Sequence, residues 1–108
     1  MAQANSSNEL VTVIITFDVA EEEQAILCGL LKTYIDDFVS HQEGFACAQI
    51  HQSICGKRVV NYTQWQSLTH HKAFTEKAKT HAELPRLLSY QPQTSFYTAA
   101  YGIDAGSH

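Results

Sequence analysis

An asparagine and the chain's only tryptophan stand four residues apart in the segment 59–67, VVNYTQWQS. Side chains alternate across a β-strand, so Asn61, Thr63 and Trp65 are expected on one face, together with Val59. Asparagine is depleted in strands, and burying its amide without a partner costs about 1–3 kcal/mol. A buried Asn61 therefore needs a partner, either in the protein or in a ligand. Amide and indole N–H groups can stabilise an oxyanion in a dry pocket, although Trp65 can also serve packing alone.

Histidines and an arginine near this segment could supply a base and a positive charge. His70 and His71 stand at the start of the next predicted helix, and His51 lies on the preceding predicted strand. Histidine titrates near neutral pH and can accept a proton from a bound molecule. Arg86 could add a fixed positive charge. Each of these four residues has a plain alternative, in which it is a solvated or locally paired polar group.

Composition limits the class of protein. The 108 residues are 44% hydrophobic and 17% charged, which fits one globular domain. The net charge of −4 and the absence of a basic patch exclude nucleic acid and anionic membranes as expected partners. No apolar run approaches the ~20 residues of a membrane span, and the N-terminus does not resemble a signal peptide. Cys28, Cys47 and Cys55 lack a CxxC spacing, which predicts reduced thiols in the cytoplasm and no metal site.

Hydrophobic periodicity predicts the element order β-α-β-β-α-β. Strands are expected at residues 10–19, 44–54, 57–65 and 94–103, and helices at 21–41 and 68–79. Cys55-Gly56 is the expected turn of a hairpin, and Ser67 is the expected N-cap of the second helix. The segment 81–92 contains two prolines and is expected to be a short broken helix or a loop.

This order predicts an α+β, ferredoxin-like fold, in which two helices cover one face of a four-stranded antiparallel sheet. The domain is expected to span residues 10–103, with a flexible N-terminus at 1–9 and a flexible tail at 104–108. The strands carry apolar residues on both faces, but the helices can cover only one. A second copy is the simplest cover for the other face, so we expect a homodimer through the open sheet face.

Four motifs together resemble the antibiotic biosynthesis monooxygenase family of dimeric α+β barrels. They are Gly44-Phe45, the hairpin after it, Val59-Val60-Asn61-Tyr62, and Gln64-Trp65-Gln66-Ser67. The resemblance covers residues 11–103.

The resemblance implies a pocket between the sheet and the helices of each subunit. Quinone-forming members build it around an asparagine and a tryptophan on the third strand and an arginine after the second helix, which match Asn61, Trp65 and Arg86. Those members also use a tyrosine on the second strand, where this chain has Ile50 and His51. A second tyrosine, early in the second helix, is replaced here by histidine.

The activity implied by the resemblance is monooxygenation without metal, flavin or haem. A small aromatic substrate, such as a phenol, anthrone or quinol, would lose a proton, reduce molecular oxygen directly and collapse through a peroxide to a quinone. On this hypothesis the catalytic residues are Asn61, Trp65, Arg86, His70 and His71, and the substrate-binding residues are His51, Thr63 and Phe17.

Two other functions stay open. Haem-degrading members of the same superfamily resemble each other in an asparagine on the first strand and a histidine–tryptophan pair on the second helix. Here residues 15–17 read ITF, Lys77 stands near the tryptophan position, and His81 is a lone candidate iron ligand. The third function is a dimeric binding or regulatory module without catalysis. A pocket containing Asn61 and Trp65 would favour the monooxygenase, and a filled core would favour the module.

Overall fold

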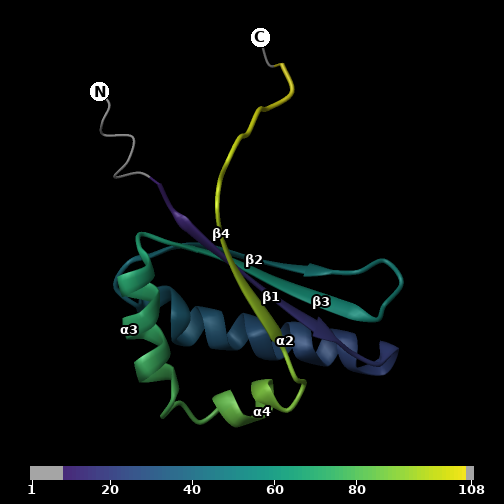
Figure 1. Ribbon diagram of the computed structural model, residues 1–108. Coiled ribbons are helices and arrows are strands. Elements are labelled where there is room, and N and C mark those ends of the chain that lie inside the picture. Colours follow the sequence, from purple (N-terminus) through teal and green to yellow (C-terminus); the bar gives the residue numbers. More distant parts are fainter. Residues whose placement is uncertain (1–8, 107–108) are drawn as a thin grey trace, which may run out of the picture.

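The computed structural model describes residues 9–106, which form a four-stranded antiparallel sheet with helices on one face (Figure 1). The elements are β1 (Val11–Asp18), α2 (Glu21–Asp37), the 3₁₀ turn η1 (Val39–His41), β2 (Phe45–Gln52), β3 (Arg58–Trp65), α3 (Leu68–Ala78), α4 (Leu84–Leu88) and β4 (Gln93–Thr98). The strand order is β2-β3-β1-β4. The predicted ferredoxin-like α+β fold is confirmed.

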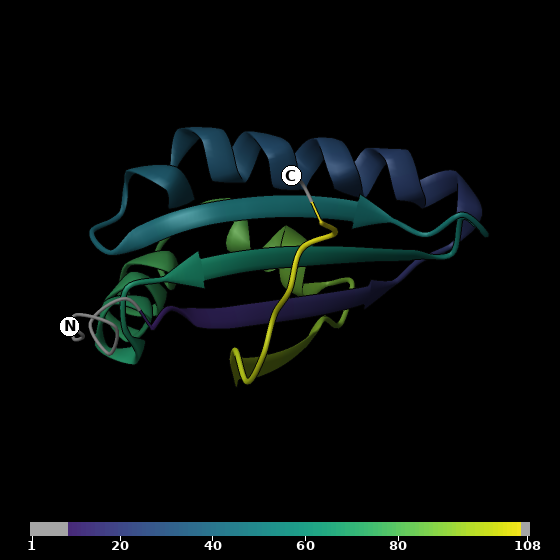
Figure 2. The same ribbon diagram turned by 90° about the horizontal axis from the view of Figure 1, so that it is seen from above.

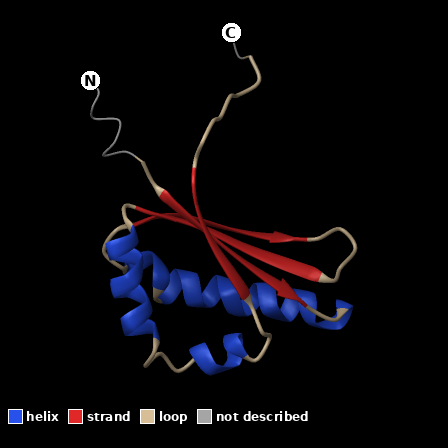
Figure 3. Ribbon diagram, viewed as in Figure 1, coloured by secondary structure: helices blue, strands red, loops and turns tan. Residues whose placement is uncertain are grey.

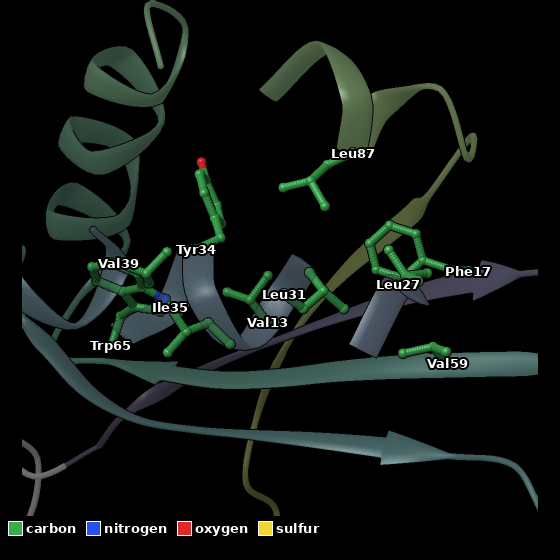
Figure 4. Close-up of a cluster of buried hydrophobic side chains, with 10 residues drawn as sticks. All are labelled: Val13, Phe17, Leu27, Leu31, Tyr34, Ile35, Val39, Val59, Trp65 and Leu87. Carbon is green, nitrogen blue, oxygen red and sulfur yellow. The ribbon is translucent and has the colours of Figure 1, made fainter. Parts of the chain in front are cut away.

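The face of the sheet that the helices cover is set by strict alternation along β3. Val59, Asn61, Thr63 and Trp65 are all buried, and the residues between them are not. Val13 on β1 lies opposite Thr63 and shares this face. Figure 4 shows the resulting core, in which side chains of α2 pack against those of β1 and β3. Burial of each large apolar side chain contributes about 1.5–3 kcal/mol, so this face holds the layers together.

Helices α2 and α3 each begin with a favourable local signal. Helix α2 begins with Glu21, Glu22 and Glu23, where the helix dipole favours negative charge, and it runs alongside the strands (Figure 2). The Ser67 hydroxyl accepts the backbone N–H of His70 at 3.1 Å, which confirms the predicted N-cap of α3.

Two expected boundaries need correction. The first helix ends at Asp37 and is followed by η1, whereas the short helix α4 within 81–92 agrees with the expectation for that segment. The expected strand 94–103 is wrong beyond Thr98, because Thr98 pairs with Val11 and β1 begins there. Residues 99–106 have no regular structure, and Tyr101 is 81% exposed. Apart from Glu9, the expected flexible segment 1–9 lies outside the described residues, as do the last two residues of the expected tail.

The second face of the sheet has no helix in the described part of the chain (Figure 3). Tyr62 on β3 and Tyr97 on β4 belong to this face, because each is paired with the outward positions of β1, Ile14 and Thr12. Tyr97 is half exposed. The homodimer expected from this apolar surface stays a prediction.

Candidate active site

A cavity of about 440 Å³ lies on the covered face of the sheet, between the sheet and all three helices. Its wall is mostly apolar and aromatic. The polar side chains on it are Tyr34, Asn61, His71, Thr75, Lys79 and Thr94. A largely apolar cavity of this volume with a few polar groups is the usual form of a small-molecule site.

Asn61 brings an unsatisfied amide oxygen to the cavity wall. Its neighbours across the sheet are Ile15 on β1 and Ile50 on β2, and neither side chain can form a hydrogen bond. The residue is 7% exposed, and its Oδ1 atom has no hydrogen-bond partner among residues 9–106. An unpaired buried polar group costs about 1–3 kcal/mol, so the fold carries Asn61 at the expense of its own stability.

His71 brings a neutral imidazole to the same wall. It is 9% exposed, and its ring lies among the rings of Trp65, Phe74 and Phe96, with centroids 5.4, 5.7 and 5.2 Å away. Burial lowers the pKa of His71 below its ordinary value, because the charged imidazolium would lose its water. A histidine that is neutral near pH 7 can accept a proton from a bound molecule.

Trp65 lies behind the cavity and does not line it. Its indole N–H donates to the Thr63 hydroxyl at 3.1 Å, and the side chain is only 1% exposed. The ring stacks on Phe74 at 4.9 Å with an interplanar angle of 27°. Trp65 therefore packs behind Phe74 and His71 and supports their rings. Thr63 accepts the hydrogen bond of the indole. Neither Trp65 nor Thr63 lines the cavity, although both were predicted to belong to the site.

His70 is placed apart from His71 on the first turn of α3. Its Nδ1 atom lies 2.8 Å from the Ser67 hydroxyl, and its ring covers Gly44. Gly44 has φ +85°, and a Cβ atom there would collide with the His70 ring. His70 lines a separate hollow of about 260 Å³, with Glu43 and Lys77, so it closes the turn before β2 and does not join the site.

His51 and Arg86 also lie away from the cavity. His51 pairs with Val60 on the uncovered face of the sheet, and its Nε2 atom lies 3.0 Å from Oε1 of Gln49. Arg86 is exposed on α4, whose leucines at 84, 87 and 88 line the cavity. Of the eight residues predicted for the site, only Asn61, His71 and Phe17 meet on the cavity wall.

Tyr34 on α2 is a cavity residue that the sequence analysis missed. Its phenol is polar, and the residue lines the cavity. Burial raises the pKa of Tyr34 to about 12. The available signal was the position of a hydroxyl-bearing side chain in an otherwise aliphatic stripe.

His81, the lone candidate haem ligand, is engaged by the protein. Its Nδ1 atom accepts the backbone N–H of Glu83 at 3.0 Å, and its ring packs on Tyr34 and Phe38. Within residues 9–106, no three His, Cys, Asp or Glu side chains are grouped so as to hold a metal ion.

No helix of the described chain has the length and hydropathy needed to cross a membrane.

Comparison with known proteins gives concordant matches. Residues 10–82 match the family described as antibiotic biosynthesis monooxygenase. Tetracenomycin-F1 monooxygenase of Streptomyces glaucescens is 32% identical over 109 residues, which is 99% of this chain and 96% of that protein. A monooxygenase of Streptomyces coelicolor, solved in complex with nanaomycin D, is 27% identical with a TM-score of 0.78, over 97% of this chain and 100% of that one. A dimeric ferredoxin-like protein from an uncultured marine organism shares the fold, with a TM-score of 0.70 at 13% identity over 88% and 99% of the chains.

Proposed function

Because the chain belongs to the antibiotic biosynthesis monooxygenase family, we propose that it oxidises a small phenol, anthrone or quinol to a quinone with molecular oxygen and no cofactor. One observation carries this proposal: the buried Asn61 side chain on the wall of an aromatic cavity, whose Oδ1 atom has no hydrogen-bond partner within residues 9–106. The S. glaucescens and S. coelicolor relatives are named for, or solved with, a specific small molecule, which supports a small-molecule substrate here.

His71 and Asn61 divide the first step between them. His71 takes a proton from the carbon or hydroxyl that is to be oxidised, and the negative charge spreads onto the phenolic or ketonic oxygen. Before the proton leaves, the unpaired Oδ1 atom of Asn61 accepts the hydrogen bond of the phenolic O–H. Once that oxygen is charged, the amide turns and donates its N–H to it. A well-placed donor of this kind in a dry site is worth about 2–4 kcal/mol of transition-state stabilisation. The apolar wall strengthens the interaction because it keeps water, with its high dielectric constant, away.

The later steps balance without a cofactor. The carbanion form of the substrate transfers electrons to oxygen, and a C–O bond forms to give a peroxide. His71 returns its proton to the peroxide, which becomes a hydroperoxide, and then takes the second proton from the same carbon. The O–O bond breaks as the carbonyl forms, and the departing hydroxide accepts that proton from His71 and leaves as water. A methylene and one oxygen molecule thus become a carbonyl and one water. Both electron pairs come from the substrate.

The open sheet face supports a homodimer as the assembly of this enzyme. Its apolar and aromatic side chains, including Tyr62 and Tyr97, have no cover within the described chain. A second copy presents the same surface, so two sheets can pack face to face about a two-fold axis. The cavity lies on the opposite face of the sheet, so each subunit would keep its own site.

Oxygen consumption tests the proposed activity. Protein treated with a chelator is mixed with a panel of anthrones and hydroquinones, and uptake is recorded against the autoxidation of each compound. We expect uptake that chelator does not reduce, with one water formed per anthrone converted to its quinone. A hydroquinone already carries both oxygens, so its oxidation would yield hydrogen peroxide instead. Uptake that requires added iron, flavin or haem would contradict the proposal. A Soret band on haem addition, together with haem breakdown, would favour the haem-degrading alternative.

A further inference from the structure

The cavity wall has a second polar group that the proposed mechanism does not use. Tyr34 reaches the cavity from α2, whereas Asn61 reaches it from β3. Figure 4 shows the Tyr34 hydroxyl pointing away from the core cluster, on the side where α3 and α4 lie. Both helices contribute residues to the same cavity. Tyr34 and Asn61 thus reach the same cavity from different layers of the fold.

The Tyr34 ring is held in place, but its hydroxyl forms no hydrogen bond within residues 9–106. The ring meets His81 edge to face at 4.9 Å and lies 5.5 Å from Phe38. The residue is 7% exposed. Burial is the only cause of its raised pKa, about 12, so no charged or hydrogen-bonded neighbour accounts for that shift. Near neutral pH the hydroxyl is protonated and available as a donor.

Asn61 and Tyr34 can form hydrogen bonds with different kinds of ligand atom. The Oδ1 atom of Asn61 accepts a hydrogen bond, which a phenolic O–H can donate. The Tyr34 hydroxyl donates one, which a carbonyl oxygen can accept. A ligand with both oxygens satisfies both groups, whereas a simple phenol leaves the Tyr34 donor unused in a dry site. Sites built to pair with a polar atom discriminate against analogues that lack it.

We infer that Tyr34 is a specificity-determining residue, which donates a hydrogen bond to a carbonyl oxygen of an aromatic substrate whose phenolic oxygen Asn61 holds. The site then prefers hydroxyaryl ketones and quinones to plain phenols of the same size. This inference rests on the proposed function for the kind of ligand, but it concerns binding and not turnover.

A matched pair of ligands and a matched pair of variants test this inference. The ligands are 5-hydroxy-1-tetralone and 5,6,7,8-tetrahydro-1-naphthol, which share a skeleton and a phenol and differ in the carbonyl. Calorimetry measures the affinity of each for the full chain and for Tyr34→Phe, which removes one oxygen atom. The control is Tyr90→Phe, because the Tyr90 hydroxyl donates to Glu23 at 2.7 Å and Tyr90 does not line the cavity.

We expect Tyr34→Phe to weaken tetralone binding about fivefold to tenfold and to leave naphthol binding within about twofold, as one hydrogen bond would. Tyr90→Phe should change neither affinity. Equal losses for both ligands would show a structural effect of Tyr34 and would overturn the inference, as would no loss for either. Carbonyl-dependent binding in a protein that never consumes oxygen would overturn the proposed activity and leave this inference standing.

Discussion

The indole N–H of Trp65 donates to the hydroxyl of Thr63 at 3.1 Å, two residues earlier on the same strand and the same face. This pairing uses the one donor of the tryptophan inside the protein. It leaves Asn61 as the residue of this strand face with an unsatisfied side chain. The tryptophan therefore supports Phe74 and His71, whose rings it contacts, and our proposal assigns contact with the substrate to the asparagine.

Trp65→Phe tests this division of roles. The smaller ring leaves a gap behind Phe74 and an unused acceptor on Thr63, so the free energy of unfolding should fall by about 2 kcal/mol. Turnover of the folded protein should fall by less than about tenfold, since no substrate contact is lost. Urea denaturation and steady-state kinetics measure the two effects. A hundredfold loss of kcat with unchanged stability would show instead that the indole reaches the substrate.

Two adjacent histidines give a matched comparison on α3. His71→Phe keeps an aromatic ring among Trp65, Phe74 and Phe96 but removes the base, so turnover should fall by about 10²-fold or more. His70→Asn removes a ring that faces Gly44 and Ser67, outside the cavity, and should leave kcat nearly unchanged. Stopped-flow or electrode measurements of oxygen uptake distinguish them. Equal losses in the two variants would show that neither histidine is the base.

The direction of the His71 pKa shift predicts how activity and stability depend on pH. Burial lowers the pKa of His71 from 6.5, and the base acts in its neutral form, so kcat/KM should fall only below pH 6.5. The unfolded chain binds this proton at a higher pH than the folded chain. The His71 contribution to the unfolding free energy is therefore lost as pH falls from 6.5 through the lowered pKa.

His71→Phe should remove this part of the pH dependence of stability. Tyr34 and Lys79 are the other ionisable groups on the cavity wall, and burial raises the pKa of Tyr34 to about 12, far above this range. Chemical denaturation between pH 5 and pH 8, read alongside kcat/KM, gives both curves. An acid limb centred above pH 6.5 would contradict the assignment of the base.

Phe96 separates the cavity from a neighbouring hollow, and its removal should change how tightly substrates of different size bind. It lies on β4 with its ring 5.2 Å from that of His71, and it borders both the cavity and a neighbouring hollow of about 300 Å³. Phe96→Ala should join the two spaces and raise KM for a bicyclic substrate about tenfold. Because Phe96 is half exposed, stability should change little. Tyr97→Ala, on the opposite face, is the control, and an equal rise in its KM would contradict this role.

The proposed dimer depends on the uncovered face of the sheet. Tyr62→Glu places a charge at the centre of that face, and its burial against a second sheet would be costly, so the variant should be monomeric. Lys72→Glu, exposed on α3, should leave the assembly unchanged. Light scattering during size-exclusion chromatography reports the mass. A wild-type mass of one chain at micromolar concentration would refute the dimer.

Much of the fold follows from periodicity that can be read in the sequence. Alternation along 59–65 placed Asn61 and Trp65 on the covered face, and Ser67 marked the start of α3. The end of β4 could not be read in this way, because residues 99–103 continue an apolar pattern. A strand needs a hydrogen-bonded neighbour, and β1 begins at Val11, which pairs with Thr98, so residues after Thr98 have no strand beside them to pair with.

The candidate site was less predictable, since it depends on how each helix turns against the sheet. His70 and His71 lie about 100° apart around one helix, and only packing decides which faces inward. The same holds for Arg86 beside Leu87 on α4. His51 is different, because the predicted turn at Cys55-Gly56 already pairs it with Val60 on the outward face. Its placement was available from the hairpin register alone.

Oxygen uptake by Asn61→Leu, beside the wild type, tests the central claim most directly. Leucine has a similar volume and removes a buried amide that the protein leaves unpaired, so the unfolding free energy should stay the same or rise by about 1 kcal/mol. Turnover should fall by about 10²-fold, because the oxyanion loses its donor. A stable variant with little activity is the predicted result. Undiminished uptake by the folded variant would contradict the account.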